Sequence, residues 1–306
     1  MTELLENGWV VVVKHDCPTC ELVQPVLRKM ADSGTPLQVF SQDDPSFPEG
    51  LATVVDDRDL EQSFRLEIES VPTLIRRENG QEMERTVGWH RGEWWELTGI
   101  AGLGEELPEL QPGCGSLSVE PGVAERLQAS FGEVPFQSRQ IPLSENEDPI
   151  EVAYDRGWSD GFPVVPPTDE RILRMLEGTS RPWHEVIGKM PPNLVDCTVE
   201  KVAINAVMAG CRPEYLPVVL GALEAALVPK FTLHGLMATT WFSTPVIIVN
   251  GPIAKRIGMN SGLNALGQGN RANATIGRAV NLVLRNVGGV VPGGIDRSTL
   301  GAPSKY

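Results

Sequence analysis

The sequence GWVVVVKHDCPTC, residues 8–20, decides how the first part of the chain folds. Four consecutive valines are typical of a buried β-strand. After Cys20 the apolar residues recur at the spacing of one helix face, at Leu22, Val23, Val26, Leu27 and Met30. The stretch therefore predicts a strand that delivers two cysteines to the first turn of a helix.

The spacing of Cys17 and Cys20 suits thiol–disulfide chemistry. The first turn of a helix has unpaired backbone N–H groups and partial positive charge, and both favour a thiolate at Cys17. Cys20 follows one turn later, where its thiol can resolve a mixed disulfide. Lys14 and His15 favour the thiolate, whereas Asp16 disfavours it, so the redox potential is left open.

Two other interpretations of this CxxC motif remain: half of a zinc site, or two unrelated cysteines. A zinc site needs a second pair of ligands, and Cys114, Cys197 and Cys211 are each isolated in the sequence. We therefore expect a redox-active Cys17–Cys20 disulfide, with no other certain cofactor and no metal ligands at the motif.

Residues 1–103 resemble the thioredoxin superfamily. Strands are expected at 8–15, 37–41, 72–77 and 82–88, and helices at 18–32, 57–68 and 92–102. The resemblance implies that Pro72 forms a cis bond beside the CxxC and presents the Val71 backbone to a substrate. Pro18 follows the first cysteine, as in glutaredoxins, and Asp16 stands where thioredoxins carry tryptophan.

Length and composition predict two globular domains in this 306-residue chain. Residues 1–6 are acidic and short of an apolar run, and no stretch reaches transmembrane length, so we expect no signal peptide and no membrane partner. An odd count of five cysteines then favours reduced thiols and a cytoplasmic location.

The net charge of −14 is unevenly spread. Residues 1–103 carry −10, residues 104–150 carry −7 and residues 151–306 carry +3. The acidic first half argues against nucleic acid as a partner.

We expect the first domain to end at Leu103, a linker to cover 104–147 and an α/β catalytic domain to cover 148–306. The linker is rich in Glu, Pro, Gly and Ser, and it is long for a loop inside one domain. One helix is predicted within it, at Val123–Phe131. Cys114, between two glycines, is either an incidental thiol in a tight turn or a mobile cysteine that meets the CxxC or a second active site.

The second domain has a mixed pattern, which places the whole chain in the α/β class. Helices are predicted at 150–156, 168–176, 198–210, 213–227 and 274–287, strands at 231–240 and 245–250, and a loop at 258–273.

No acidic residue occurs between Glu224 and Asp296, a run of 71 positions that includes the 258–273 loop. Glycines let a backbone approach a ligand, amide side chains donate without charge, and arginines bind carboxylate or phosphate. The alternative is a loop that merely turns the chain, with arginines facing a partner. We expect a pocket for a small anionic substrate, built from Asn260, Asn264, Asn270, Arg271, Asn273 and Arg278.

Two further residues are candidates for catalysis. Cys211 follows the 198–210 helix and lies about 20 Å from Cys197, which precedes it. His234, beside Gly235 and near cationic residues, suits a general acid, although a single histidine is more often structural. A metal shared by Cys211, His234 and a ligand from a partner stays open.

Four stretches of the second domain, 153–161 (AYDRGWSDG), 199–211 (VEKVAINAVMAGC), 249–252 (VNGP) and 269–278 (GNRANATIGR), resemble a bacterial family without settled function. The family is often found beside small selenocysteine- or cysteine-containing proteins with a UGSC motif. The resemblance covers most of 111–306. Its members continue past the position of Tyr306, which implies a second subunit that completes the domain.

These observations predict a two-domain thiol-dependent redox enzyme, or a subunit of one. Cys17 attacks, Cys20 resolves, Pro72 shapes the docking groove, and Cys114 or Cys211 receives the electrons, while the second domain binds a small anionic or sulfur-containing substrate. One alternative is a lyase or transferase for a sulfur-containing substrate. The other is a non-catalytic assembly subunit with a structural CxxC.

Overall fold

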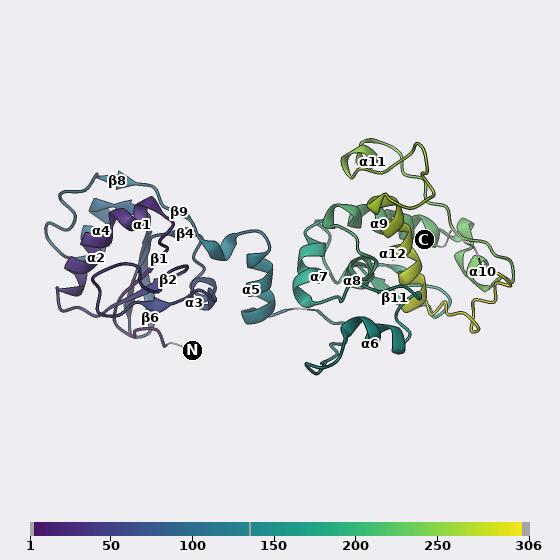
Figure 1. Ribbon diagram of the computed structural model, residues 1–306, viewed down its shortest axis with the longest axis horizontal. Coiled ribbons are helices and arrows are strands. Elements are labelled where there is room, and N and C mark those ends of the chain that lie inside the picture. The colour runs from purple at the N-terminus through teal and green to yellow at the C-terminus, as the bar shows by residue number, and fades with distance from the viewer. Residues whose placement is uncertain (1–2, 135, 302–306) are drawn as a thin grey trace. The chain divides into compact units, whose positions relative to one another are not determined.

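A computed structural model describes residues 3–134 and 136–301, and the chain divides into two compact units, residues 1–133 and 134–306 (Figure 1). Each unit has its own hydrophobic core. Helices occur in both units together with strands, so the α/β class is confirmed. Where we expected a domain end at Leu103, the structure keeps 104–133 with the first unit. The continuation expected beyond Tyr306 lies outside the described residues.

The first unit is built on a five-stranded sheet of order β3-β2-β1-β5-β6. The central strand β1 (Gly8–Val13) runs parallel to β2 (Leu37–Ser41) and antiparallel to β5 (Thr73–Glu78). The edge strands are β3 (Val55–Asp56) and β6 (Gln81–Val87). All four valines of β1 are fully buried, because the central strand is covered on both faces.

Helices connect and follow the strands of this sheet along the chain. The helix predicted at 18–32 is two helices, α1 (Pro18–Leu22) and α2 (Gln24–Ala31), which meet at Val23. The helix predicted at 57–68 is shorter, α3 (Glu61–Arg65), and α4 (Arg91–Thr98) packs against β5 and β6.

Residues 110–116 return to the first unit instead of forming a linker, and we call this segment the strap. Its first part, β8 (Leu110–Gln111), pairs with β7 (Trp89–His90). Its second part, β9 (Cys114–Gly115), pairs with β4 (Ser70–Val71). The helix predicted after it is confirmed as α5 (Val123–Phe131), which packs on α3.

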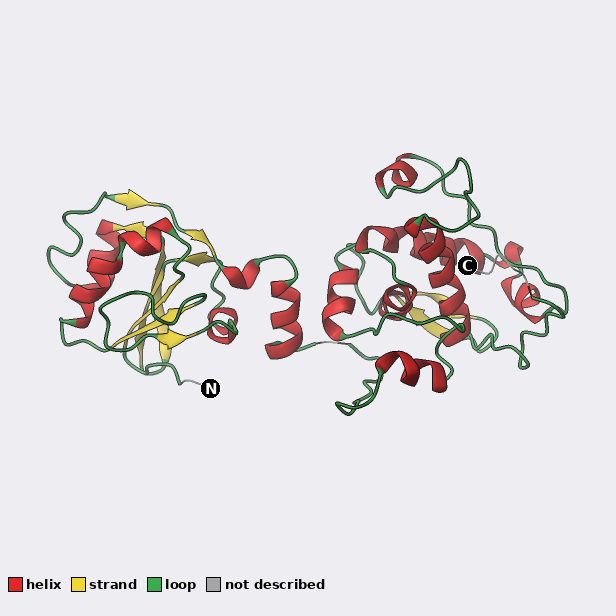
Figure 2. Ribbon diagram, in the orientation of Figure 1, coloured by secondary structure: helices red, strands yellow, loops and turns green. Residues whose placement is uncertain are grey.

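The second unit is mainly helical (Figure 2). Helix α8 (Val199–Ala209) packs against α7 (Asp169–Leu176), α9 (Leu216–Leu227) and α12 (Arg271–Asn286). Thr198 caps α8 through its side chain, and Gly210 ends the helix in the left-handed conformation that suits glycine. These helices, and α6 (Pro149–Asp155), agree with the prediction within a few residues.

The strands predicted for the second unit were wrong. Residues 231–240 contain a short helix instead, α10 (Leu233–Ala238), and 245–250 pair with no strand within the described part of the chain. An apolar run forms a strand only where a partner supplies hydrogen bonds, so its residue types alone misled the prediction. The hairpin β10 (Val186–Met190) and β11 (Val195–Thr198), and helix α11 (Pro252–Arg256), were not predicted.

Within residues 3–134 and 136–301, no single helix has both the length and the apolar character needed to cross a membrane. Two consecutive helical segments, Pro213–Leu227 and Pro229–Ala238, meet those criteria only when taken together, and they are bent by 73° at the break between them.

Candidate redox site

Cys17 is the residue directly before α1, and its sulfur accepts a hydrogen bond from the first turn of that helix. The backbone N–H of Cys20 donates to Cys17 Sγ over 3.4 Å. On the other side, Cys17 Sγ lies 3.6 Å from the carbonyl oxygen of Val71, to which the protonated thiol donates. Both cysteines are buried, and the Val71–Pro72 peptide is cis, as expected. The structure thus brings Cys17, Cys20 and Pro72 together.

Cys114 is the third thiol of this site. In the β4–β9 pair it lies directly opposite Val71, the residue whose carbonyl contacts Cys17. The half-buried Cys114 thiol lowers the pKa of Cys17, and the Cys20 thiol lowers it more. Three of the five cysteines therefore belong to one site.

The hydrogen bonds make Cys17 the acidic member of the group. The thiol of Cys20 has the largest effect and, with Cys114 and the backbone N–H groups of Cys20 and Thr19, it lowers the pKa of Cys17 to about 5 against the opposing effect of burial. Burial raises the pKa of Cys20 far above its usual range, and burial also raises the pKa of Cys114. The site therefore favours the thiolate at Cys17 and the thiol at Cys20 and Cys114, which is the state that a nucleophilic cysteine requires.

This arrangement predicts a pH dependence. The ultraviolet absorbance of a thiolate should appear with a midpoint near pH 5, because the pKa of Cys17 falls to about 5 from an ordinary 9.0. Since the folded-state pKa is the lower one, the stability this group contributes is fully present above pH 9.0 and is lost as the pH falls through about 5. Cys17→Ala should lack the step. An absorbance step only near the ordinary thiol pKa would contradict the assignment.

The strap is fastened beside the cysteines by hydrogen bonds to its backbone. Thr19 Oγ1 donates to the carbonyl of Pro112 over 2.6 Å, and Lys14 Nζ donates to that of Gly115 over 2.9 Å. Ser70 Oγ donates to the carbonyl of Cys114 over 2.9 Å. Cys114 therefore lies in a short paired strand and not in a tight turn, and its mobility stays a prediction.

Gly113 allows the strap to lie this close. A Cβ atom at this position would stand 2.6 Å from Ser70 Oγ and 2.9 Å from the Val71 carbonyl oxygen. At Gly115, two residues later, a Cβ atom would meet no heavy atom within 4 Å. Gly115 therefore has space for a side chain and Gly113 does not, although the two glycines flank the same cysteine.

A buried polar network anchors the far end of the strap. Gln42 Nε2 donates to Ser116 Oγ over 2.7 Å and to Ser63 Oγ over 2.8 Å. Ser63 Oγ in turn donates to the carboxylate of Asp57 over 2.6 Å. Sequence analysis missed this network and the strap; the only local signal was the glycine on each side of Cys114.

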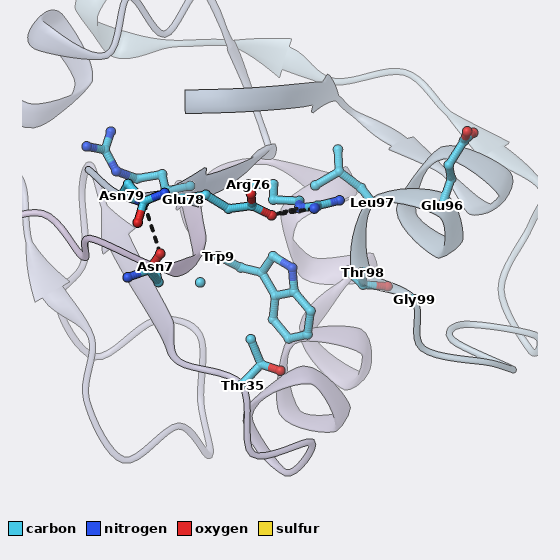
Figure 3. A pocket seen from close by; sticks show the side chains of 12 residues that line it. Asn7, Trp9, Thr35, Arg76, Glu78, Asn79, Glu96, Leu97, Thr98 and Gly99 are labelled. Atoms are coloured by element: carbon cyan, nitrogen blue, oxygen red, sulfur yellow. Dashed lines mark hydrogen bonds and ion pairs between the residues drawn. The ribbon is translucent and has the colours of Figure 1, made fainter. Parts of the chain in front are cut away.

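A groove of about 480 Å³ lies at the other end of β1 (Figure 3). Asn7 and Gly8, at the start of β1, line this groove. Arg76 and Glu78 line it too and form an ion pair with each other. Cys17 follows the opposite end of β1, and six strand residues span roughly 17 Å at about 3.3 Å each. The groove is therefore not part of the cysteine site.

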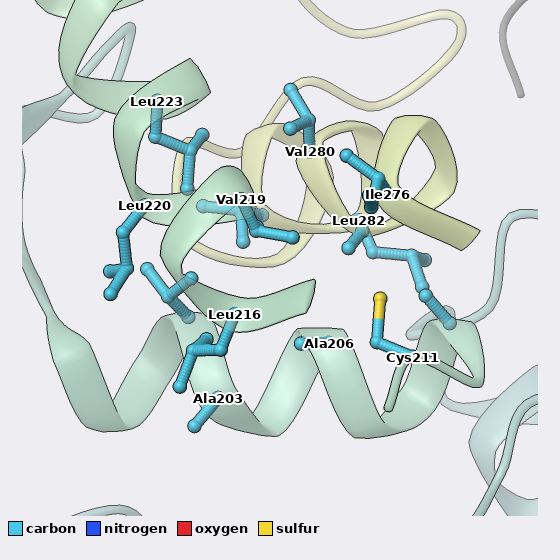
Figure 4. Packing of buried hydrophobic residues seen from close by; sticks show 14 of the residues in the cluster. Ala203, Ala206, Cys211, Leu216, Val219, Leu220, Leu223, Ile276, Val280 and Leu282 are labelled. Carbon is cyan, nitrogen blue, oxygen red and sulfur yellow. The ribbon is translucent and has the colours of Figure 1, made fainter. Parts of the chain in front are cut away.

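The candidates Cys211 and His234 belong to the second unit. Cys211 is buried, and its sulfur points toward α12, where it donates to the carbonyl of Thr275 over 3.3 Å (Figure 4). Burial raises the pKa of Cys211 to about 11, which makes it a poor nucleophile near neutral pH. His234 is exposed on α10.

The asparagines of the 258–273 loop bind the loop itself. Asn273 donates through Nδ2 to the carbonyls of Asn260 and Ala265, and Asn270 caps α12 by accepting from the N–H of Asn273. Asn264 Nδ2 donates to the carbonyl of Gln268. These amides thus shape the loop, and their role toward a substrate stays a prediction.

Arg278 forms an ion pair with an acidic residue that lies outside the stretch 225–295, which contains no acidic residue. Its guanidinium binds both carboxylate oxygens of Asp160, over 2.8 and 2.9 Å, and both side chains are about 15% exposed. It also donates to the carbonyls of Phe162 and Pro163. Arg271 donates to the carbonyl of Gly210. The acid that Arg278 needs is therefore supplied by a loop 118 residues earlier.

A smaller cavity of about 120 Å³ lies near this pair and is lined by Asp160, Asn281, Arg285 and Asp296, among others. In the described ranges, no group of three or more His, Cys, Asp or Glu side chains is arranged to hold a metal ion.

Comparison with known proteins returned no relative. No family model matches the chain, and no curated protein or solved structure is significantly similar to it.

Proposed function

We propose that the first unit is a thiol–disulfide oxidoreductase with a thioredoxin-like site, in which Cys17 is the nucleophile and Cys20 the resolving thiol. The observation that carries the proposal is the buried Cys17 sulfur at the start of α1, which accepts a hydrogen bond from the backbone N–H of Cys20. The sheet order and the Val71 carbonyl beside Cys17 add support. We place the reaction in the reducing cytosol, where a dithiol persists.

The reaction follows from the protonation states. The Cys17 thiolate attacks one sulfur of a substrate disulfide, forms a mixed disulfide and releases the other substrate sulfur as a thiolate. Cys20 then attacks Cys17 Sγ, and the bond to the substrate breaks. The proton of the Cys20 thiol goes to the second substrate thiolate. One disulfide is reduced, and the Cys17–Cys20 pair is oxidised by the same two electrons.

A trapped mixed disulfide tests this proposal. Because Cys114 also lies beside Val71, both possible resolving thiols are replaced in a Cys20→Ser/Cys114→Ser double variant of the full chain. We expect glutathione disulfide to leave one stable adduct on Cys17 in the double variant. The unmodified chain should release both thiols and form an internal disulfide. Alkylation and peptide mass spectrometry distinguish these products.

Two results would contradict the proposal. If Cys17 stayed unmodified in both proteins, it would not be the nucleophile. A stable adduct on the unmodified chain, without release of the second thiol, would favour a transferase or lyase over an oxidoreductase.

A further inference from the structure

We propose that Cys17 forms a second, alternative disulfide with Cys114 of the strap, and that this disulfide closes the redox site against polypeptide substrates. The proposal rests on the proposed function, because it needs a reactive Cys17. It concerns a different pair of sulfur atoms, however, and the two claims are tested separately.

The strand pairing places both cysteines beside one residue, Val71. Cys114 lies directly opposite Val71 in the antiparallel β4–β9 pair, and residues opposite one another in such a pair have Cα atoms about 4.5–5.5 Å apart. Cys17 Sγ is 3.6 Å from the carbonyl oxygen of the same Val71. Cys17 and Cys114 therefore flank the same residue, and the disulfide forms when their side chains turn toward each other beside Val71.

The strap also occupies the backbone edge beside the nucleophile. A polypeptide substrate that added a strand along Ser70 and Val71 would need the hydrogen bonds that β9 already makes. Cys17 is 1% exposed beneath this cover. The strap therefore lies where a substrate chain would dock, and it carries a cysteine at the position next to the nucleophile.

The step is a disulfide exchange within the chain. From the Cys17–Cys20 disulfide produced by turnover, the Cys114 thiolate attacks Cys17 Sγ. The Cys17–Cys20 bond breaks as the Cys17–Cys114 bond forms, and Cys20 takes up the proton that Cys114 released. No electrons are gained or lost. The reverse attack by Cys20 reopens the site, so the strap acts as a reversible cover held by one covalent bond.

The first test compares full-length Cys20→Ser with the Cys20→Ser/Cys114→Ser double variant in glutathione disulfide. We expect the single variant to expel glutathione and form the Cys17–Cys114 disulfide, detected as a linked pair of peptides. The double variant should retain glutathione on Cys17. A stable glutathione adduct in both would overturn the proposal and leave the proposed function intact, whereas an unmodified Cys17 in both would remove the function itself.

The second test uses the two glycines beside Cys114 in a chain that keeps all its cysteines. Gly113→Ala introduces a Cβ atom 2.6 Å from Ser70 Oγ, whereas Gly115→Ala meets nothing within 4 Å. In an oxidising glutathione buffer we expect Gly113→Ala to lower the ratio of Cys17–Cys114 to Cys17–Cys20 disulfide by at least about tenfold, the scale of strain from overpacking. Gly115→Ala should leave the ratio unchanged.

If the two substitutions changed the disulfide ratio equally, the position of the strap would have no role in forming the Cys17–Cys114 disulfide.

The rate at which a polypeptide disulfide is reduced provides a further measurement on the same proteins. Reduction of a disulfide-linked peptide should be faster in Gly113→Ala than in Gly115→Ala, because only the former loosens the cover beside Val71.

Discussion

Replacing Cys17 by serine is expected to abolish disulfide reduction by the full chain. The fall should be on the order of 10³-fold or more, within the range that follows removal of a catalytic nucleophile. A serine hydroxyl stays protonated near neutral pH, whereas the hydrogen bonds around Cys17 lower its pKa to about 5. The measurement is a single-turnover reaction of the reduced protein with a small aromatic disulfide, followed by absorbance.

The matched control is Cys197→Ala. Cys197 is also a buried cysteine, but it belongs to the second unit, and burial raises its pKa to about 12. This variant should keep the rapid phase of the reaction in full. A rapid phase that survives Cys17→Ser would mean that another thiol is the nucleophile, and the proposed function would then fail.

Replacing Arg278 by methionine is expected to destabilise the second unit by about 3 kcal/mol, because it leaves a mostly buried carboxylate without its charge partner. Asp160 would lose both contacts with the guanidinium, and the carbonyls of Phe162 and Pro163 would lose a donor. Calorimetry of the full chain measures the loss. Hydrogen exchange should show lower protection at 157–165 and in α12.

Arg212→Met is the control for charge removal alone. The Arg212 side chain is 56% exposed and stands 3.8 Å from Glu214, so its loss should cost less than about 1 kcal/mol. Asp160→Asn combined with Arg278→Met should recover part of the stability. If Arg278→Met left stability unchanged and weakened binding of a small anion instead, the substrate role expected from the sequence would be favoured.

Local patterns were sufficient for much of the secondary structure. The run of valines indicated β1, and the apolar spacing after Cys20 indicated the helical segment that follows it. The helix at Val123–Phe131 was predicted with its bounds. Each of these signals lies within a window of about 6–18 residues, the range over which side-chain periodicity is informative.

The prediction of secondary structure failed where strand formation depends on pairing with a segment far away in the sequence. The 245–250 run has strand-like residues, yet no partner strand lies beside it in the described ranges. Conversely, β4 and β9 consist of two residues each, too few for any periodicity, and they pair across 43 to 45 positions. Hydrogen bonds between such segments depend on which backbone edges are free, and that depends on the whole fold.

The same distinction separates the two halves of the candidate redox site. The sequence by itself determined the α/β class and the close approach of Cys17 and Cys20, because three residues of separation at a helix start bring them together. Only the tertiary structure decided that Cys114 lies opposite Val71 and that Arg278 is paired with Asp160. Both contacts join segments far apart in the chain, and no local pattern of residues specifies which of them meet.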